Sequence, residues 1–323
     1  MKTPIVYTLV SSEEDIYLEQ LYVSIYSLRL YNPNAIVLVL VDKKTFDSLI
    51  GYRSIIKEFA DKILIIETPT HYTAKERSRE IKTSIRKHIK GDFLFLDTDT
   101  IITDKLDDVD NIKADIAIVE DFHVPFSEYP FRKYIINTMK YIFDIDVSNT
   151  IDYFNSGAMY VKDTEVTHQF FNAWNKNWRY SAFKKNNSQD QPALMKTNYD
   201  FKNIIQKLDG VYNCQIAASI KYLYKAKVIH FFNANFFGKT EYSPFFTKEF
   251  YLNIRQNKGL SEIDKYIIQN CKESFSPYST PIGEKEFKFL NSSFGKRLLK
   301  IYTTKGILYK TINLLLKILN KIG

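Results

Sequence analysis

Glycine is scarce in this chain, at 10 of 323 residues, and the motifs G-x-G-x-x-G and G-x-x-x-x-G-K are absent. These motifs form the phosphate-binding loops of dinucleotide-binding and P-loop proteins, so both kinds of nucleotide site are excluded. The only two cysteines, Cys214 and Cys271, lie far apart in the sequence and form no C-x-x-C pair. A disulfide framework and a thiolate zinc site are therefore unsupported, and we expect two inert thiols in a reducing compartment.

Long apolar runs are also lacking. No stretch reaches the roughly 18 uninterrupted apolar residues that a transmembrane helix needs. The short N-terminal run from Ile5 to Val10 is followed at once by the acidic residues 13–15, unlike a secretory signal. A hydrophobic content of 45% nevertheless suffices for one large or two modest cores. We expect a folded cytoplasmic protein.

The positive charge is confined to one end of the chain. Of the formal net charge of +8, residues 296–323 contribute seven Lys and Arg and no acid. The remaining residues hold 38 basic and 37 acidic side chains, a net charge of +1. Because the body of the protein is electrostatically ordinary, no binding of nucleic acid is predicted.

Apolar, β-branched runs alternate with stretches of helical periodicity. This order predicts a Rossmann-like, mostly parallel open α/β sheet with helices on both faces. The first predicted strands are 4–10, 35–41, 63–67 and 93–96, separated by helices 16–31, 44–59 and 74–89. Strands at 116–119, 158–161 and 228–232 and helices at 165–180 and 190–195 follow, while residues 123–152 are expected to be irregular.

Two aspartates follow the most apolar strand. Asp97 and Asp99 come directly after Phe93-Leu94-Phe95-Leu96, at the sheet edge where α/β proteins bind ligands. Two close carboxylates repel each other unless a cation joins them, and oxygen ligands favour Mg²⁺ or Mn²⁺ shared with a diphosphate. His230, in a later apolar strand, would suit Mn²⁺ as a third ligand. The alternatives are solvated aspartates and a core histidine.

Four segments in order carry a family resemblance: F-L-F-L-D-T-D, Y-F-N-S-G-A-M-Y-V, Q-D-Q-P-A-L and V-I-H-F-F. Together they resemble the nucleotide-sugar glycosyltransferases of the GT-A fold, particularly glycosyltransferase family 8, over residues 4–240. The resemblance implies transfer of a hexose from a nucleotide-diphosphate sugar, with a UDP-sugar expected, to a glycan, glycolipid or other acceptor. It also implies retention of anomeric configuration and a role in bacterial surface polysaccharide or lipopolysaccharide assembly.

The resemblance also assigns residues to the site. It implies Mn²⁺, or Mg²⁺, on Asp97, Asp99 and His230, and a reaction centre at Asp190 and Gln191. The donor-binding residues that it implies are Thr8, Ser11, Tyr17, Arg79, Lys82, Thr98, Asn155, Ser156 and Lys239. For Arg79 and Lys82, a solvated basic helix face is the equal alternative.

One departure from the family concerns the segment after His230. The family continues with His-x-x-Gly-x-x-Lys-Pro-Trp, whereas here Phe231-Phe232-Asn233-Ala234-Asn235 follows. Gly238 and Lys239 come too late for that register. The lysine that should contact the β-phosphate is therefore not identified with certainty, although the histidine assignment stands.

We expect a GT-A catalytic domain over residues 1–245, with a nucleotide-binding half at 1–100 and an acceptor-binding half at 101–245. A helical or irregular part at 246–295 and a basic amphipathic tail helix at 296–323 follow. Lys310, Lys317 and Lys321 share one face of this helix and leucines the opposite face, which favours peripheral attachment to an anionic membrane, expected at the inner face of the plasma membrane. Packing on the catalytic domain or on another subunit of a homo-oligomer is the alternative.

Two other functions stay open at this point. A nucleotidyltransferase or other phosphoryl-transfer enzyme would also place acidic metal ligands after a strand. A non-catalytic, membrane-attached scaffold could bind sugar nucleotides with the same fold.

Overall fold

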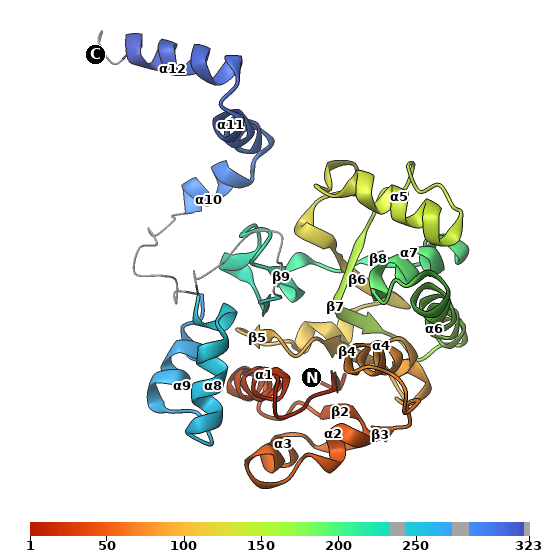
Figure 1. Cartoon of the computed structure of the whole chain (residues 1–323). Helices are drawn as coiled ribbons and strands as arrows, with labels where there is room; N and C mark the ends of the chain where they lie inside the picture. Colours follow the sequence, from red (N-terminus) through yellow and green to blue (C-terminus); the bar gives the residue numbers. More distant parts are fainter. Residues whose placement is uncertain (233–242, 273–283, 320–323) are drawn as a thin grey trace. The chain divides into compact units, whose positions relative to one another are not determined.

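The computed structural model describes residues 1–232, 243–272 and 284–319 (Figure 1). The chain forms two compact units, Met1–Ser276 and Pro277–Gly323. Among the described residues, no helix has the length and apolar character needed to span a bilayer. Lys239 lies outside the described residues.

The first unit is built on a seven-stranded sheet with the order β3-β2-β1-β4-β7-β6-β8. All neighbouring strands pair in parallel except β7, which is antiparallel to both β4 and β6. This confirms the predicted α/β fold class with a mostly parallel sheet. The strands are β1 Ile5–Leu9, β2 Val37–Asp42, β3 Lys62–Ile66, β4 Phe93–Leu96, β6 Ile116–Glu120, β7 Phe154–Val161 and β8 Gln206–Lys207.

Both faces of this sheet are covered, so its central strands are apolar along their whole length. In β4, Leu94 and Leu96 belong to one hydrophobic core, whereas Phe93 and Phe95 belong to the other. The residues of β1 alternate in the same way. Strands that alternate buried side chains between two cores need helices on both sides, as the sequence predicts.

The elements agree with the predicted order, with two differences in the helices and one in a strand. The stretch predicted as one helix at 44–59 consists of two short helices joined by a 3₁₀ turn, and an additional helix, α5, lies in the segment expected to be irregular. The segment Asn155-Ser156-Gly157 lies inside β7 and not before it. The helices of the first unit are α1 Tyr17–Tyr31, α2 Lys43–Asp47, α3 Ile56–Phe59, α4 Ala74–Ser84, α5 Arg132–Phe143, α6 Glu165–Lys185, α7 Asp190–Asp200, α8 Lys248–Gln256 and α9 Glu262–Gln269.

A second, small sheet lies beside the first. It contains β5 Thr100–Ile102, β10 Val228–His230 and β9 Cys214–Gln215, with β10 in the middle. Strand β10 is antiparallel to β5, and this pairing places His230 opposite Thr100. The predicted strand 228–232 therefore ends at His230, where its side chain meets the end of β4.

The first unit extends past residue 245, where the sequence analysis placed the end of the catalytic domain. Helices α8 and α9 both pack near α1. Arg255 on α8 forms a two-pronged ion pair with the fully buried Glu19 of α1, at 2.8 and 2.7 Å. Because a buried carboxylate needs such a partner, α8 is an integral part of this unit.

The second unit is helical, as expected for the C-terminal part of the chain. Its helices are α10 Glu284–Asn291, α11 Ser293–Thr304 and α12 Ile307–Leu319. Ser292 caps α11 by accepting a hydrogen bond from the backbone N–H of Gly295. The tail is therefore two successive helices, where the sequence analysis expected one.

Candidate active site

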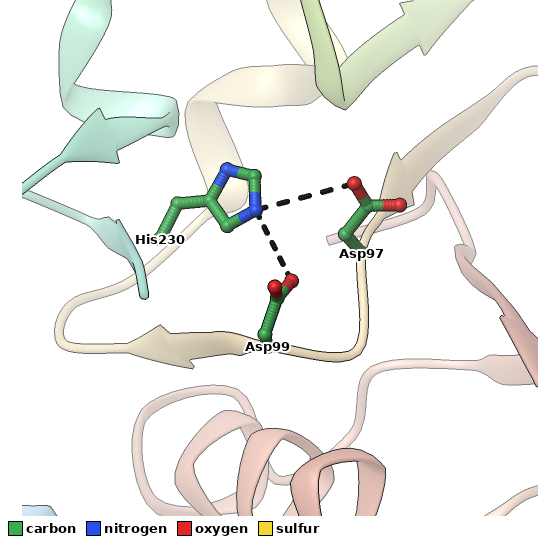
Figure 2. Close-up of side chains that lie close together, drawn as sticks. All are labelled: Asp97, Asp99 and His230. Carbon is green, nitrogen blue, oxygen red and sulfur yellow. Dashed lines mark ion pairs between the residues drawn. The ribbon is translucent and has the colours of Figure 1, made fainter. Parts of the chain in front are cut away.

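Three side chains that could hold a metal ion meet at the carboxyl end of β4 (Figure 2). The carboxylates of Asp97 and Asp99 and the imidazole of His230 offer ligand atoms that all lie within 4.8 Å of one another. His230 Nε2 lies 3.1 Å from Asp99 Oδ1 and 4.0 Å from Asp97 Oδ2. The structure therefore brings together the three residues that the sequence predicts as metal ligands.

Backbone pairing explains why residues so distant in sequence converge. The N–H of Phe231 donates to the carbonyl of Asp99 at 2.8 Å, so β10 continues its pairing up to the aspartate. On the other side, the N–H of Asp97 donates to the carbonyl of Gly157 in β7 at 2.8 Å. Both sheets therefore fix the turn that holds the two aspartates.

Burial and charge act against each other in this cluster. Burial favours the neutral form of Asp99, but the nearby His230 outweighs it and lowers the pKa of Asp99. Burial likewise acts to lower the pKa of His230, whereas Asp99 raises it, with a raised pKa as the result. A cationic group is thus electrostatically favoured between the aspartates.

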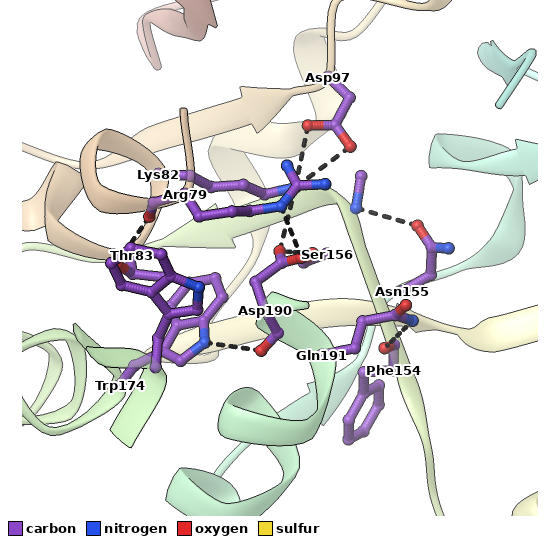
Figure 3. A network of polar contacts seen from close by, with 12 residues as sticks. Arg79, Lys82, Thr83, Asp97, Phe154, Asn155, Ser156, Trp174, Asp190 and Gln191 are labelled. Carbon is purple, nitrogen blue, oxygen red and sulfur yellow. Dashed lines mark hydrogen bonds and ion pairs between the residues drawn. The ribbon is translucent and has the colours of Figure 1, made fainter. Parts of the chain in front are cut away.

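Lys82 on α4 connects Asp97 with Asp190 (Figure 3). Its Nζ lies 2.9 Å from Asp97 Oδ1 and 3.6 Å from Asp190 Oδ2, and its side chain is only 2% exposed. Arg79, one turn earlier on α4, pairs with Asp190 Oδ1 at 3.1 Å and keeps 31% of its side chain exposed. The two basic residues thus form a charged bridge and are not a solvated helix face.

Asp190 is the first residue of α7 and is held from three directions. Ser156 Oγ donates to its carboxylate at 2.8 Å, and Trp174 Nε1 donates to its backbone carbonyl at 3.1 Å. Burial acts to raise the pKa of Asp190, but Arg79 and Lys82, together with Ser156, overcome this effect and lower it. Asp190 therefore stays ionised, as an anchor for the two cations.

A chain of hydrogen bonds through amide side chains and the Asp121 carboxylate connects His230 to Gln191. His230 Nδ1 and Asn213 Oδ1 are 2.9 Å apart, and Asn213 Nδ2 donates to Asn155 Oδ1 at 3.0 Å. Asn155 Nδ2 donates to Asp121 Oδ1 at 2.9 Å, and Gln191 Nε2 contacts Asp121 Oδ2 at 3.3 Å. Because Asn213 presents an oxygen to Nδ1, a proton is held there, and Nε2 is the ring nitrogen that faces Asp97 and Asp99.

The sequence analysis did not single out Asp121 and Asn213. Asp121 directly follows the strand β6, so the same reasoning that identified Asp97 could have found it. Burial raises its pKa, although Asn155, Tyr129 and Gln191 all donate hydrogen bonds to its carboxylate. Asn213 has no comparable signal, because it precedes a strand of only two residues.

Apart from Asn213 and Trp174, the charged and amide side chains described above line one open cleft with a volume of about 940 Å³. The sequence-predicted residues that line it are Thr8, Tyr17, Arg79, Lys82, Asp97, Thr98, Asp99, Asn155, Ser156, Asp190, Gln191 and His230. Ser11 is buried outside this lining, and its hydroxyl donates to Asp15 and accepts from Arg53. Its predicted contact with the donor is therefore not supported by the geometry, since its hydroxyl serves a loop network instead.

Aromatic side chains form another part of the cleft wall. Phe122 and Phe232 stack with ring centres 6.4 Å apart, and the ring of Phe232 also lies 5.1 Å from that of His230. Tyr129 and Phe131 complete this aromatic wall. The cleft thus combines a charged end, suited to a diphosphate, with an apolar surface on which a sugar ring can pack.

Comparison with known proteins identifies the family. The family model described as nucleotide-diphospho-sugar transferase matches residues 74–259, more than half of the chain. No curated protein sequence matches the chain.

Solved structures share the fold at low sequence identity. The galactosyltransferase LgtC, in complex with donor and acceptor sugar analogues, is 14% identical, with 82% of this chain and 99% of LgtC covered and a TM-score of 0.51. The bifunctional glycosyltransferase WbbM is 16% identical, with 82% of this chain and 51% of WbbM covered and a TM-score of 0.50. With the GT-A fold and the family match in agreement, this chain belongs to the nucleotide-diphospho-sugar transferase family and is a glycosyltransferase.

Proposed function

We propose that the protein is a metal-dependent, retaining hexosyltransferase of the family 8 type. Its donor is a UDP-sugar, and its acceptor is a glycan or glycolipid in bacterial surface polysaccharide or lipopolysaccharide assembly. The observation that carries the proposal is the convergence of Asp97, Asp99 and His230 within one cleft. The cytoplasmic location and the division into a nucleotide-binding and an acceptor-binding half stay predictions.

The donor set of the cluster fits a divalent cation. Two carboxylates and one imidazole suit Mn²⁺, whereas Mg²⁺ prefers oxygen ligands throughout. Asp97 and Asp99 keep 27% and 24% of their side chains exposed toward the cleft, while His230 is 4% exposed. A cation held by these residues would act as a Lewis acid toward the donor diphosphate.

The protein's own charges would assist departure of the diphosphate. Arg79 lines the cleft and keeps 31% of its side chain exposed, so it would contact the diphosphate directly and stabilise the charge that develops on it. Lys82 is too deeply buried for such a contact, and it would instead hold the carboxylates of Asp97 and Asp190 in place. Gln191, fixed by Phe154 and Asp121, would orient the sugar as its ring acquires oxocarbenium character.

The proposal is tested by a screen of sugar nucleotides for Mn²⁺-dependent release of nucleoside diphosphate, which needs no knowledge of the acceptor. UDP-galactose is the first donor to test, because LgtC is a galactosyltransferase with this fold. Turnover of one UDP-sugar, abolished by EDTA, is the expected result. Turnover of a nucleoside triphosphate with a sugar phosphate would favour the nucleotidyltransferase alternative. Absence of any metal-dependent nucleotide binding would favour the scaffold alternative.

Gln191→Ala separates orientation of the sugar from binding of the diphosphate. We expect kcat and kcat/KM to fall together, by about 100-fold, because the contact would act mainly in the transition state. Steady-state kinetics on the donor found by the screen measures both constants. A rise in KM at unchanged kcat would move Gln191 out of the reaction centre. The anomeric configuration of the product, read by NMR, tests retention separately.

A further inference from the structure

The second unit carries almost the whole positive charge of the protein. Residues 296–323 contain seven Lys and Arg and no Asp or Glu. Within the described part of this unit, the side chains of Lys296, Arg297 and Lys300 on α11 and of Lys310 on α12 are all exposed. No acid of the same helices can neutralise them.

The charges of α11 lie on one face of the helix. At about 100° per residue, Lys296, Arg297 and Lys300 fall within about a third of the helix circumference. Phe294, Leu298, Ile301 and Tyr302 share the opposite face. Phe294 and Tyr302 are 65% and 61% exposed, so the described residues of the second unit do not cover this apolar face.

Helix α12 is apolar over more of its circumference than α11, since Ile307, Leu314 and Ile318 lie on the same side as Lys310. Leu308, Ile312, Leu315 and Leu316 lie on one side of the helix, opposite Lys310. Leu308, Leu315 and Leu316 are 57%, 55% and 53% exposed. Single exposed leucines are common on soluble proteins, but two successive helices that each expose several apolar side chains indicate a binding surface.

We propose that α11 and α12 bind flat on an anionic lipid bilayer, with their apolar faces at the boundary between headgroups and acyl chains. Both helices are too short to cross the roughly 30 Å of a hydrocarbon core, as 13 residues extend over only about 20 Å. Their basic faces complement phosphate-bearing headgroups, and the lysine and arginine side chains are long enough to reach them.

The charge also argues against the main alternative, a second copy of the chain. A tail-to-tail dimer would bring two sets of seven cations together without any acid to compensate them. An anionic bilayer supplies the missing negative charge. The proposal does not depend on glycosyl transfer, although a lipid-linked acceptor would be present at the same surface.

Flotation of the full chain with lipid vesicles tests the proposal. We expect the protein to float with vesicles of phosphatidylcholine containing 30% phosphatidylglycerol, and much less with pure phosphatidylcholine. Added salt should weaken the binding.

In the charge variant, Lys296→Gln, Arg297→Gln, Lys300→Gln and Lys310→Gln are combined. Each cation near the membrane surface contributes about a fivefold factor to the partition coefficient between vesicles and water. The partition coefficient of the charge variant, which lacks four cations, should therefore fall several hundredfold.

A matched control replaces four exposed lysines of the first unit, with Lys87→Gln, Lys90→Gln, Lys133→Gln and Lys176→Gln combined. It removes the same charge and should bind vesicles nearly as the parent does. Equal losses in both variants would mean that only net charge matters, and would overturn the assignment to α11 and α12. Flotation of neither the parent nor the variants would also overturn it, as would self-association through the tail without vesicle binding.

A fluorescent reporter tests insertion of the apolar face. Both native tryptophans, Trp174 and Trp178, are fully buried, so their emission should be insensitive to vesicles. With Leu315→Trp on α12, we expect a blue shift with anionic vesicles and quenching by brominated acyl chains. Ile263→Trp, at a 71% exposed position of α9, is the control and should show neither. An unshifted Leu315→Trp spectrum would contradict insertion.

Mn²⁺-dependent UDP binding, measured on the charge variant, would remain at the parental level whether or not the tail binds lipid.

Discussion

Gly157 determines how closely the His230 ring can approach β7. A Cβ atom at this position would lie 2.3 Å from Cε1 and 2.6 Å from Nδ1 of the imidazole, and 2.8 Å from Asn155 Oδ1. These distances are far below van der Waals contact, and His230 is too deeply buried to move without disturbing Asn213. The glycine of the N-S-G segment is therefore required by the close approach of two side chains to the strand.

The first prediction follows from that contact. We expect Gly157→Ala to displace His230 and to weaken Mn²⁺-dependent nucleotide binding by about 10- to 100-fold, as loss of a supporting group at a metal site does. Isothermal titration calorimetry with UDP and Mn²⁺ measures the effect. Gly259→Ala, where an added Cβ meets no atom within 4 Å, is the matched control. Unchanged binding by Gly157→Ala would show that His230 is not required at its observed place.

The second prediction separates Arg79 from Lys82. Arg79→Ala should weaken UDP binding about tenfold and lower the free energy of unfolding less than Lys82→Met does, because Asp190 keeps Lys82 and Ser156 as partners. Lys82→Met should instead lower the free energy of unfolding by about 3–5 kcal/mol, since Asp97 and Asp190 lose a buried partner. Urea unfolding and nucleotide titration of both variants provide the comparison. Equal stability of the two variants would refute the assigned difference.

At the scale of elements, the turn after β6 is strained. Phe122 and His123 both have positive φ, 56° and 58°, a conformation that few residues other than glycine adopt. The turn presents Asp121 to the cleft and directs His123 into the interior, where its Nε2 accepts a hydrogen bond from the Gln215 N–H at 3.0 Å. Such strain is retained where a functional geometry depends on it.

The third prediction concerns pH and this same turn. Burial, aided by the positive charge of Lys221, lowers the pKa of His123 from 6.5 to about 3. Between these values the unfolded chain binds a proton that the folded chain does not, so stability is complete above pH 6.5 and decreases as pH falls. The histidine alone should cost about 2 kcal/mol between pH 7 and pH 5.

His123→Gln tests this contribution, because glutamine retains an acceptor for the Gln215 N–H but does not titrate. The free energy of unfolding, measured in urea at pH 7 and pH 5, should fall less in the variant than in the parent. An equal pH dependence of the two proteins would show that His123 is not the group responsible.

The elements that sequence predicts well are those with strong local patterns. The run Phe93 to Leu96 is buried on both faces, and its continuous apolar character indicates this directly. Strands β8 and β9 have two residues each, too few for any periodicity, and they were not predicted. Helix α5 buries Ile135, Met139 and Ile142 at helical spacing, but exposed aromatics on its other face obscure the pattern.

The ligand cluster itself was predictable, whereas its supporting network was not. Asp97 and Asp99 follow a recognisable strand, and His230 lies in another recognisable apolar strand. The contact of His230 with Asn213 depends on the pairing of β10 with β9. The contact of Asn155 with Asp121 depends on the pairing of β6 with β7. Such long-range register leaves no mark in local composition, so the amide chain became visible only in the fold.

At the scale of the whole molecule, two units with different surface chemistry are joined in one chain. The first unit contains the cleft and nearly balanced charge, and the second contains the excess of basic residues. This separation of charge was correctly located from the sequence. The first unit includes α8, beyond residue 245, because the packing of α8 on α1 rests on the distant pair of Arg255 and Glu19.

The most direct test of the account is metal-dependent binding of a nucleoside diphosphate. UDP is titrated by calorimetry into the parent protein, Asp99→Asn and Glu67→Gln, each with Mn²⁺ and with EDTA. Glu67 is the control, an exposed carboxylate that also follows a strand but does not line the cleft. We expect the parent to bind UDP only with Mn²⁺, Asp99→Asn to lose at least about 100-fold in affinity, and Glu67→Gln to bind as the parent does. Equal UDP binding in EDTA, or undiminished binding by Asp99→Asn, would contradict the account.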